Sequence, residues 1–333
     1  MRLFFIFKRL AMLVLVLGLS IIGGIFWWAT TPLGFPESIV DFRVLPGSSV
    51  RQAVTQMNQA GLGIEPNLTL LGIRFVGIDN KLKAGTYSVK AGSSPLDVLT
   101  MLKNGDISLV ELRFPEGWSL QQWLQYLANQ ADIEHDLVGL PTSEISKRIG
   151  INLQNPEGFF FPDTYKVDKH ASDSEVLRKA YRIQQDKLMA AWKKRAPDLP
   201  YKTPYEALTM ASIVEKETGR AEDRTRVAAV FVNRLRSGMR LQTDPTVIYG
   251  MGESFDGNIR KADLLRDTPY NTYTRSGLPP TPITMPGLAS IEAALHPAEE
   301  DIYYFVARGD GSSQFSRTLA EHNAAVVRYQ LKH

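Results

Sequence analysis

The hydrophobic pattern begins with a long apolar run close to the N-terminus. Residues 10–30 carry no charged side chain and are rich in Leu, Val and Ile, and three basic residues precede them within residues 1–9. This length matches the roughly 20 residues that a helix needs to cross a bilayer. The preceding positive charge predicts that residues 1–9 are cytoplasmic, and the Trp27–Trp28 pair suits the opposite interface. We expect a transmembrane anchor at 10–30; a cleavable signal peptide is the alternative.

A pattern of strand, Gly-Ser cap and short helix then occurs three times. Strands are expected at 40–44, 85–89 and 109–114, and helices follow each cap at 50–60, 95–104 and 120–128. Together they predict a small α+β domain at 38–130. In size and in the order of its elements this domain resembles LysM-type glycan-binding modules, although a spacer that binds no ligand fits the pattern nearly as well.

The remaining pattern predicts a larger mixed α+β domain at 150–333. Helices are expected at 172–194, at 208–218, from 222 onwards and at 318–331, and a strand pair at 303–306 and 314–316 flanks a Gly-Asp-Gly turn. Phe159–Phe161, between a Gly and a Pro, have two interpretations. They form either a buried hinge that packs one domain on the other or an aromatic wall for sugar rings. The predicted fold class is therefore α+β, with an N-terminal transmembrane helix.

The helix at 208–218 is apolar or small on every side from Leu208 to Val214, so we expect it to be buried. Side chains on a helix lean toward its N-terminus. Glu215 therefore lies over two small residues that leave room for a cleft. Glu217 points about 200° away around the helix, over larger residues that fill their own space. The pattern thus favours Glu215 as the acid that faces a half-dry pocket.

A carboxyl group held against apolar surface loses hydration of its charged form, so its pKa rises. Such a group can donate a proton near neutral pH and later take one back. The alternative is that Glu215 is a solvated helix-end charge or a member of a structural ion pair.

Two polar loops follow this helix at 241–246 and 270–273; the first contains Pro245, and the second leads into a Gly-Leu-Pro-Pro segment. We expect Pro245 to keep the first loop out of helix. Rigid loops of this composition suit ligands rich in hydroxyl and amide groups, because the donors and acceptors are fixed before binding. Plain turns also have this composition.

The composition excludes several classes of function. The chain of 333 residues contains no cysteine, so disulfides, cysteine-type zinc sites and thiol catalysis are ruled out. The formal net charge of +3 is too small to indicate a nucleic-acid partner. The five histidines show no metal-ligand spacing and no P-loop occurs. For His296 and His322 we expect structural roles.

Six motifs now identify a family. They are Glu157-Gly-Phe-Phe-Phe-Pro-Asp-Thr-Tyr165, Ala211-Ser-Ile-Val-Glu-Lys-Glu217, Phe231-Val-Asn-Arg-Leu235, Leu241-Gln-Thr-Asp-Pro-Thr246, Tyr270-Asn-Thr-Tyr273 and Gly277-Leu-Pro-Pro280. Their order resembles the YceG-like family over nearly the whole chain. That resemblance implies an endolytic lytic transglycosylase, which cuts the β-1,4 bond between N-acetylmuramic acid and N-acetylglucosamine without water and leaves a 1,6-anhydro end.

The resemblance also implies roles for individual residues. Glu215 is expected to be the single general acid and base. Candidate substrate contacts are Gln242, Thr243, Asp244, Asn271 and Tyr273, with Glu157 as a more remote possibility. No metal and no cofactor is implied. Two rival functions remain: a membrane-anchored peptidoglycan-binding protein without activity, and a hydrolase that pairs Glu215 with a second carboxylate such as Asp244.

The implied setting is the periplasmic side of a bacterial inner membrane, with a single membrane pass. The expected substrate is the nascent glycan strand of peptidoglycan, whose length the enzyme would set. Peptidoglycan synthases (penicillin-binding proteins) are plausible partners, and no nucleic acid is expected.

Overall fold

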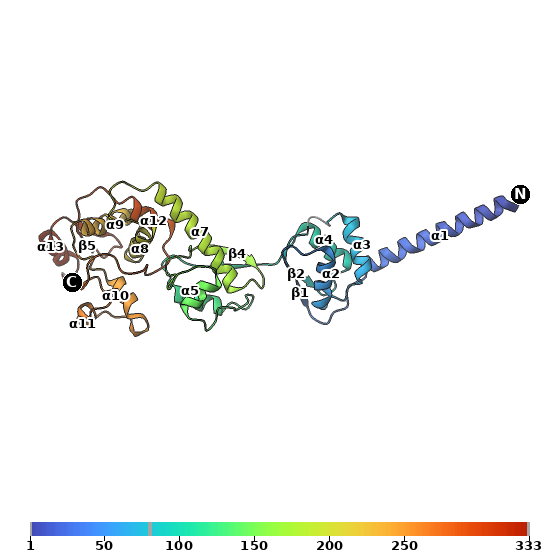
Figure 1. Ribbon diagram of the computed structural model, residues 1–333, viewed down its shortest axis with the longest axis horizontal. Helices are drawn as coiled ribbons and strands as arrows, with labels where there is room; N and C mark the ends of the chain where they lie inside the picture. The colour runs from blue at the N-terminus through green and yellow to red at the C-terminus, as the bar shows by residue number, and fades with distance from the viewer. Residues whose placement is uncertain (1, 79–81, 332–333) are drawn as a thin grey trace. The chain divides into compact units, whose positions relative to one another are not determined.

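The computed structural model describes residues 2–78 and 82–331 (Figure 1). Parts of three predicted segments lie outside the described residues. These are residue 1 of the cytoplasmic segment, residues 79–81 of the small domain and residues 332–333 of the larger domain. The chain divides into two compact units. Unit 1 comprises Met1–Val110 and Lys166–His170, and unit 2 comprises Glu111–Tyr165 and Ala171–His333.

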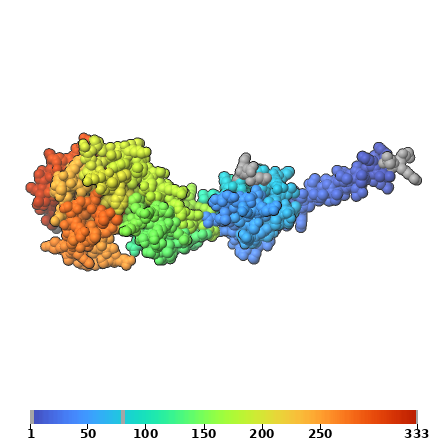
Figure 2. Space-filling view, viewed as in Figure 1, coloured from blue at the N-terminus to red at the C-terminus, as the bar shows by residue number. Residues whose placement is uncertain are grey.

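Helix α1, Arg2–Thr30, contains the apolar run at the N-terminus. Its segment Phe4–Thr30 is long and apolar enough to cross a membrane, and none of its most apolar window is buried. Figure 2 shows this helix as an uncovered rod at the blue end of the chain. The helix has the properties of a membrane anchor or of a signal sequence.

The rest of unit 1 is a strand–helix–helix–strand arrangement followed by one more helix. Its elements are β1 Ile39–Val44, α2 Val50–Gln59, α3 Pro66–Val76, β2 Gly85–Lys90 and α4 Pro95–Asn104. The strands pair antiparallel from Ile39 opposite Lys90 to Val44 opposite Gly85. The predicted strands and the helices α2 and α4 are confirmed, whereas α3 was not predicted.

Local capping explains where these helices begin. Ser49 and Ser94 each form a capping box with the third residue of their helix, which pairs two otherwise unsatisfied backbone donors. Helix α3 begins differently, because the side chain of Glu65 accepts from the Leu68 N–H and Pro66 occupies the first turn.

The chain passes between the units in strands β3, Leu109–Arg113, and β4, Thr164–Asp168, which form a two-stranded sheet. Helix α5, Leu120–Ala128, follows with Ser119 as its cap, as predicted. Since the first segment of unit 1 ends at Val110, most of the third strand–cap–helix repeat belongs to unit 2.

Unit 2 is mostly helical, so the protein is a mixed α+β chain with small two-stranded sheets. Its further elements are α6 Thr142–Arg148, α7 Asp173–Lys193, α8 Pro204–Glu217, α9 Ala221–Arg236, α10 Asp244–Met251, η1 Gly252–Ser254, α11 Lys261–Leu265, α12 Leu288–Leu295, β5 Tyr304–Ala307, β6 Ser313–Ser316 and α13 Leu319–Tyr329. Strands β5 and β6 pair antiparallel, which confirms the predicted hairpin.

Helix α8 is the centre of unit 2. Every residue from Ala207 to Val214 is buried, as the apolar pattern predicted. Its neighbours are α7, α9, α10 and α12. A helix enclosed in this way is fixed in position, so the direction in which its last residues point is fixed too.

The prediction for Pro245 was wrong. Helix α10 begins at Asp244 with Pro245 in its first turn. Proline is tolerated there because the N–H groups of the first turn have no partner within the helix.

The three phenylalanines Phe159–Phe161 are buried in the interior of unit 2. Phe159 stacks on Tyr205 and Phe160 packs beside Trp123. None of the three lines either of the two hollows of unit 2 described below, and their burial gives them a packing role.

Gly158 precedes these phenylalanines and provides a test of their packing. Its φ is +84°, and an added Cβ would lie 2.4 Å from Cβ of Pro282. We expect Gly158→Ala to lose about 1–2 kcal/mol from backbone strain and about 1–3 kcal/mol from overpacking. Urea unfolding of the detergent-solubilised chain, followed by tryptophan fluorescence, measures the loss.

Gly150→Ala is the matched control for Gly158→Ala. Gly150 has a similar φ of +82° but nothing within 4 Å of its added Cβ. It should lose only the backbone contribution. Equal losses in the two variants would contradict the close approach of Pro282.

Candidate active site

Helix α8 ends at Glu217, and Thr218 is already in an extended conformation. The carboxyl group of Glu217 accepts a hydrogen bond from the hydroxyl of Thr243. No other hydrogen bond to this carboxyl occurs within residues 2–78 and 82–331. One oxygen of a half-buried acid therefore has no protein partner.

Glu217 lines an open hollow of about 580 Å³, within the size range of ligand sites. Its polar lining is provided mainly by the end of α8, the loop before α10 and the loop before α12, and its apolar lining by β5 and α13. The lining residues are Glu217, Phe231, Arg234, Leu241, Gln242, Thr243, Asp244, Tyr273, Tyr304, Phe305, Val306, Ala307, Leu319, His322, Val326 and Gln330.

The hollow changes the acidity of Glu217. Burial raises the pKa of its carboxyl from the ordinary 4.5 to about 7, and the nearby charge of Asp244 acts in the same direction. The Thr243 hydrogen bond and the charge of Arg234 oppose this rise. A carboxyl with a pKa near 7 can both give and accept a proton at neutral pH.

Arg234 holds the polar wall of the hollow together. Its guanidinium donates to the carbonyl oxygens of Tyr303 at 2.7 Å and Leu241 at 2.8 Å, and it lies over the ring of Tyr304. Sequence reasoning missed this role of Arg234. A position near the end of an amphipathic helix gave no sign that the side chain bridges two distant loops.

Four of the predicted contact residues meet Glu217 in this hollow: Gln242, Thr243, Asp244 and Tyr273. Asp244 Oδ1 accepts from the Tyr273 hydroxyl at 2.6 Å, which ties the two loops together. Gln242 has a φ of +52°, a conformation that L-residues rarely adopt. Such backbone strain often accompanies functional sites.

Asn271 is not in the hollow, contrary to the prediction. It is fully buried, and its amide donates to the carbonyl oxygens of Asp263, Leu264 and Arg266. Its Oδ1 accepts from the N–H of Tyr273 at 2.8 Å. Asn271 thus fixes the loop that presents Tyr273, and it has no polar group left for a glycan.

Glu215 does not line the hollow either, so the geometric basis of its prediction is corrected. Its Oε2 accepts from the Gly287 N–H at 3.0 Å. Gly287 is the N-cap of α12, a position where the helix dipole favours negative charge. Glu215 therefore stabilises the start of α12 in this structure.

The small residues beneath Glu215 explain why no cleft forms there. Ser212 is fully buried, and its hydroxyl accepts from the Ile283 N–H at 3.0 Å. The segment that leads from Ile283 to α12 thus occupies the space that Ser212 leaves. Small side chains made room for a packed chain segment and not for a ligand.

Glu157 is a second buried acid, in a different place. Burial raises the pKa of its carboxyl to about 8, against hydrogen bonds that lower it. These come from the Leu120 N–H at 2.9 Å and the Tyr249 hydroxyl at 3.2 Å. Glu157 anchors the start of α5, and its bonds identify it as a structural acid at the back of a second hollow.

This second hollow of unit 2 has a volume of about 1030 Å³. It is lined by amide and charged side chains that include Gln121, Asn155, Lys216 and Glu253. Lys216 is the neighbour of Glu217, so both hollows adjoin the end of α8.

His296 and His322, for which structural roles were expected, both lie in unit 2. His322 lines the first hollow and stacks on Tyr304, and burial lowers its pKa. His296 caps the C-terminal end of α12. Within the described residues, no group of three or more His, Asp or Glu side chains could hold a metal ion.

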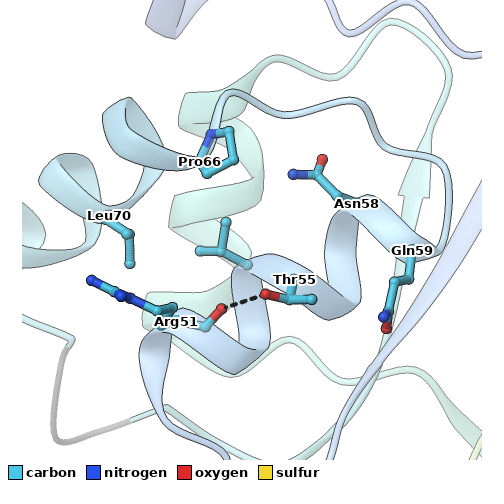
Figure 3. Close-up of a pocket in the computed structure, with 7 residues that line it drawn as sticks. Arg51, Thr55, Asn58, Gln59, Pro66 and Leu70 are labelled. Atoms are coloured by element: carbon cyan, nitrogen blue, oxygen red, sulfur yellow. Dashed lines mark hydrogen bonds between the residues drawn. The ribbon is translucent and has the colours of Figure 1, made fainter.

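Unit 1 carries a separate hollow of about 350 Å³ between α2 and α3. Figure 3 shows its lining, with the Thr55 hydroxyl donating to the carbonyl of Arg51. The Asn58 amide is held by both backbone groups of Ile64. The exposed side chains of Arg51 and Gln59 are therefore the polar groups of this hollow that remain for a ligand.

The hollow contains a half-buried carboxyl with a pKa near neutrality and is bordered by rigid polar loops. These are the features of a general acid–base site for a polar substrate. Comparison with known proteins agrees with this class. The chain belongs to the YceG-like family, which it matches over residues 42–328.

Related proteins cover most of the chain. An endolytic murein transglycosylase of Bacillus subtilis is 30% identical over 93% of this chain and 91% of its own length. One of Streptococcus pneumoniae is 28% identical over 85% of this chain, but this spans only 57% of that longer protein. A solved structure of a yceG-like protein from Listeria monocytogenes is 29% identical, with a TM-score of 0.52 over 86% of this chain and 98% of that chain.

The raised pKa of Glu217 predicts a pH-dependent cost in stability. The carboxyl ionises near pH 4.5 in the unfolded chain and near pH 7 in the folded one. The free energy of unfolding should therefore fall as pH rises through this window, by at most about 1.4 kcal/mol for each pH unit crossed. Glu157, whose pKa is about 8 in the folded chain, adds a fall of its own over an overlapping pH range. Glu217→Gln should remove only the contribution of Glu217, so the variant should unfold at higher urea than the parent at pH 8.

Urea unfolding at pH 4 and pH 8 checks this expectation, and Glu299→Gln, on the exposed surface of the same unit, is the control. The two variants should differ at pH 8 and agree at pH 4. A Glu217→Gln variant that is no more stable than the control at pH 8 would show that this acid is fully hydrated.

Proposed function

We propose that the protein is an endolytic lytic transglycosylase that cleaves the β-1,4 bond between N-acetylmuramic acid and N-acetylglucosamine in peptidoglycan. The observation that carries the proposal is the carboxyl of Glu217, half-buried and with one unpartnered oxygen, in a hollow with Gln242, Asp244 and Tyr273. The names of the Bacillus and Streptococcus relatives support it.

In the first step Glu217 acts as general acid. Its proton goes to the glycosidic oxygen while the bond from that oxygen to C1 of the muramic acid breaks. Positive charge develops on the sugar ring as an oxocarbenium-like centre. The newly formed carboxylate of Glu217 then faces this charge across the hollow.

In the second step Glu217 acts as general base. It accepts the proton of the C6 hydroxyl of the same sugar as O6 forms its bond to C1. The product is a 1,6-anhydro ring, and no water is consumed. One carboxyl suffices because the substrate supplies the nucleophile, whereas ordinary glycosidases need two.

The surrounding side chains have supporting roles in this proposal. The Thr243 hydroxyl orients the carboxyl of Glu217 and moderates its pKa. The exposed side chains of Gln242 and Asp244 and the hydroxyl of Tyr273 are placed to bind the hydroxyl and acetamido groups of the glycan. For Glu215 to act as the acid and base in place of Glu217, its hydrogen bond to the start of α12 would have to break.

The proposed location follows from α1. Retained as an anchor, this helix places the two units on the periplasmic face of an inner membrane, with the N-terminus in the cytoplasm. Newly made glycan is exposed there, and cutting within strands would set their length. Unit 1 is proposed to hold the glycan, and peptidoglycan synthases are its proposed partners.

Substitution of each glutamate distinguishes their roles. Glu217→Gln should reduce formation of 1,6-anhydro products by about 10²–10⁴-fold, the usual contribution of a general acid–base group. Glu215→Gln should keep activity within about tenfold, because the amide oxygen can still accept from the Gly287 N–H. Digestion of purified peptidoglycan with the full-length variants, followed by mass spectrometry of the fragments, measures both.

The opposite result, with Glu215→Gln inactive and Glu217→Gln active, would assign the chemistry to Glu215. Full activity in both variants would overturn the proposal and leave a peptidoglycan-binding protein. Thermal unfolding of each variant establishes that it is folded.

A hydrolase is the second candidate, and one observation favours it. Asp244 lines the same hollow and is close enough to raise the pKa of Glu217, so two carboxyls are available. A hydrolase adds water and leaves a reducing muramic acid end, which the same mass spectra detect. The bond from the Tyr273 hydroxyl to Asp244 favours a positioning role for this carboxylate.

The pH dependence of cleavage tests the role of Thr243. Since the acid must be protonated to start the reaction, kcat/KM should fall as pH rises through about 7. Thr243→Val removes a hydrogen bond that favours the charged form. It should therefore raise the pKa of Glu217 and move this fall upward by about one to two pH units, since such a bond contributes about 1.5–3 kcal/mol.

Thr225→Val, on the exposed side of α9, is the control and should leave the profile unchanged. A downward displacement in Thr243→Val would contradict the direction of the hydrogen bond.

A further inference from the structure

Helix α3 exposes a hydrophobic pair that the interior of unit 1 does not use. Phe75 is 92% exposed and Leu71 is 52% exposed. The two lie four residues apart and so share one face of the helix. Arg74 lies next to Phe75 and is exposed as well. Large aromatic side chains are rarely left open to water to this extent unless they meet a partner.

The position of α3 in unit 1 limits what that partner can be. The end of α1 is packed directly on the unit, because Trp28 and Leu33 contact its core and the Leu33 N–H donates to the Ser93 carbonyl at 2.8 Å. No flexible linker separates the apolar helix from the folded unit. Any membrane that α1 spans therefore ends close to the first turn of α4.

The exposed pair is adjacent to that first turn. Leu96, in the first turn of α4, is itself 44% exposed. One turn later, Leu99 lies against Gly72 of α3, where an added Cβ would be 2.7 Å from its methyl group. Gly72 lies between Leu71 and Phe75 in the sequence. Figure 1 shows α3 on the side of the unit that α1 joins.

We propose that Leu71, Arg74, Phe75 and Leu96 form a membrane-docking face that lies in the lipid headgroup region beside α1. The headgroup region is about 5–8 Å deep on each side of the hydrocarbon core. Apolar side chains with an adjacent cation suit this region, because the ring enters the acyl boundary while the guanidinium reaches the lipid phosphates. The inference rests on the proposal that α1 is a retained anchor.

The docking face gives unit 1 a fixed height and tilt above the bilayer, which a single spanning helix cannot do alone. The hollow between α2 and α3 has Leu70 in its wall, one residue from Leu71 of this face. That hollow would therefore open close to the membrane surface, where new glycan emerges.

The absence of cysteine from the chain makes a direct test possible. Single substitutions Leu71→Cys, Lys103→Cys and Leu17→Cys each give one site for a nitroxide label. The full-length variants are reconstituted in vesicles of phosphatidylethanolamine and phosphatidylglycerol. Electron paramagnetic resonance then compares collision of each label with oxygen, which prefers lipid, and with a water-soluble nickel chelate.

Lys103 is the matched control, because it is exposed at the far end of α4, about 10 Å along that helix from Leu96. Leu17 reports whether α1 is inserted. We expect the oxygen-to-nickel ratio at position 71 to exceed that at 103 several-fold and to remain below that at 17. Adding Phe75→Ser to Leu71→Cys should bring the ratio at 71 down toward that at 103.

If the oxygen-to-nickel ratio at position 71 equals that at 103 while position 17 is in lipid, the docking face is overturned but α1 is still a membrane anchor. A water-like ratio at 17 would instead show that the anchor itself fails, and cleavage assays on the same vesicles test the proposed reaction separately. Dipolar broadening between labels at position 71 would mean that a second copy of the chain covers this face, which also overturns the proposal.

Discussion

A helix that is enclosed on every side has room for a carboxyl group only where it ends. Burial of α8 from Ala207 to Val214 is the constraint on which unit 2 depends. It fixes Glu215 at the start of α12 and Glu217 at the open hollow. The cost of holding an acid there appears as a pKa near 7, so the packing that stabilises the unit also sets the acidity on which the proposed proton transfer depends.

Much of the fold was predictable because short-range signals determine it. Ser49, Ser94 and Ser119 each mark the start of a helix through contacts with residues three positions away. Helix α3 is capped over the same distance, by Glu65 and the Leu68 N–H, but Glu is not among the residues that usually mark the start of a helix. The start of α3 was missed for this reason.

The site was predictable in part, for a different reason. Gln242, Thr243, Asp244 and Tyr273 lie in polar loops close behind the buried helix, and these loops meet its end. The choice between Glu215 and Glu217 required knowledge that no helical wheel contains. A wheel gives the direction of a side chain but not what lies there, and Ile283, about 70 residues away, fills the space beneath Glu215. Asn271 has the right chemistry but is turned inward by three backbone carbonyls.

A raised pKa alone does not identify a catalytic acid in this protein, because Glu157 and Glu217 both have one. Their hydrogen bonds distinguish them. Glu157 accepts from the backbone of α5 and from Tyr249, so moving its proton would weaken contacts that hold the unit together. Glu217 has a single hydroxyl partner, Thr243, which can rotate to follow the charge. An acid that must lose and regain a proton in every cycle needs few and adjustable partners, and of these two only Glu217 has them.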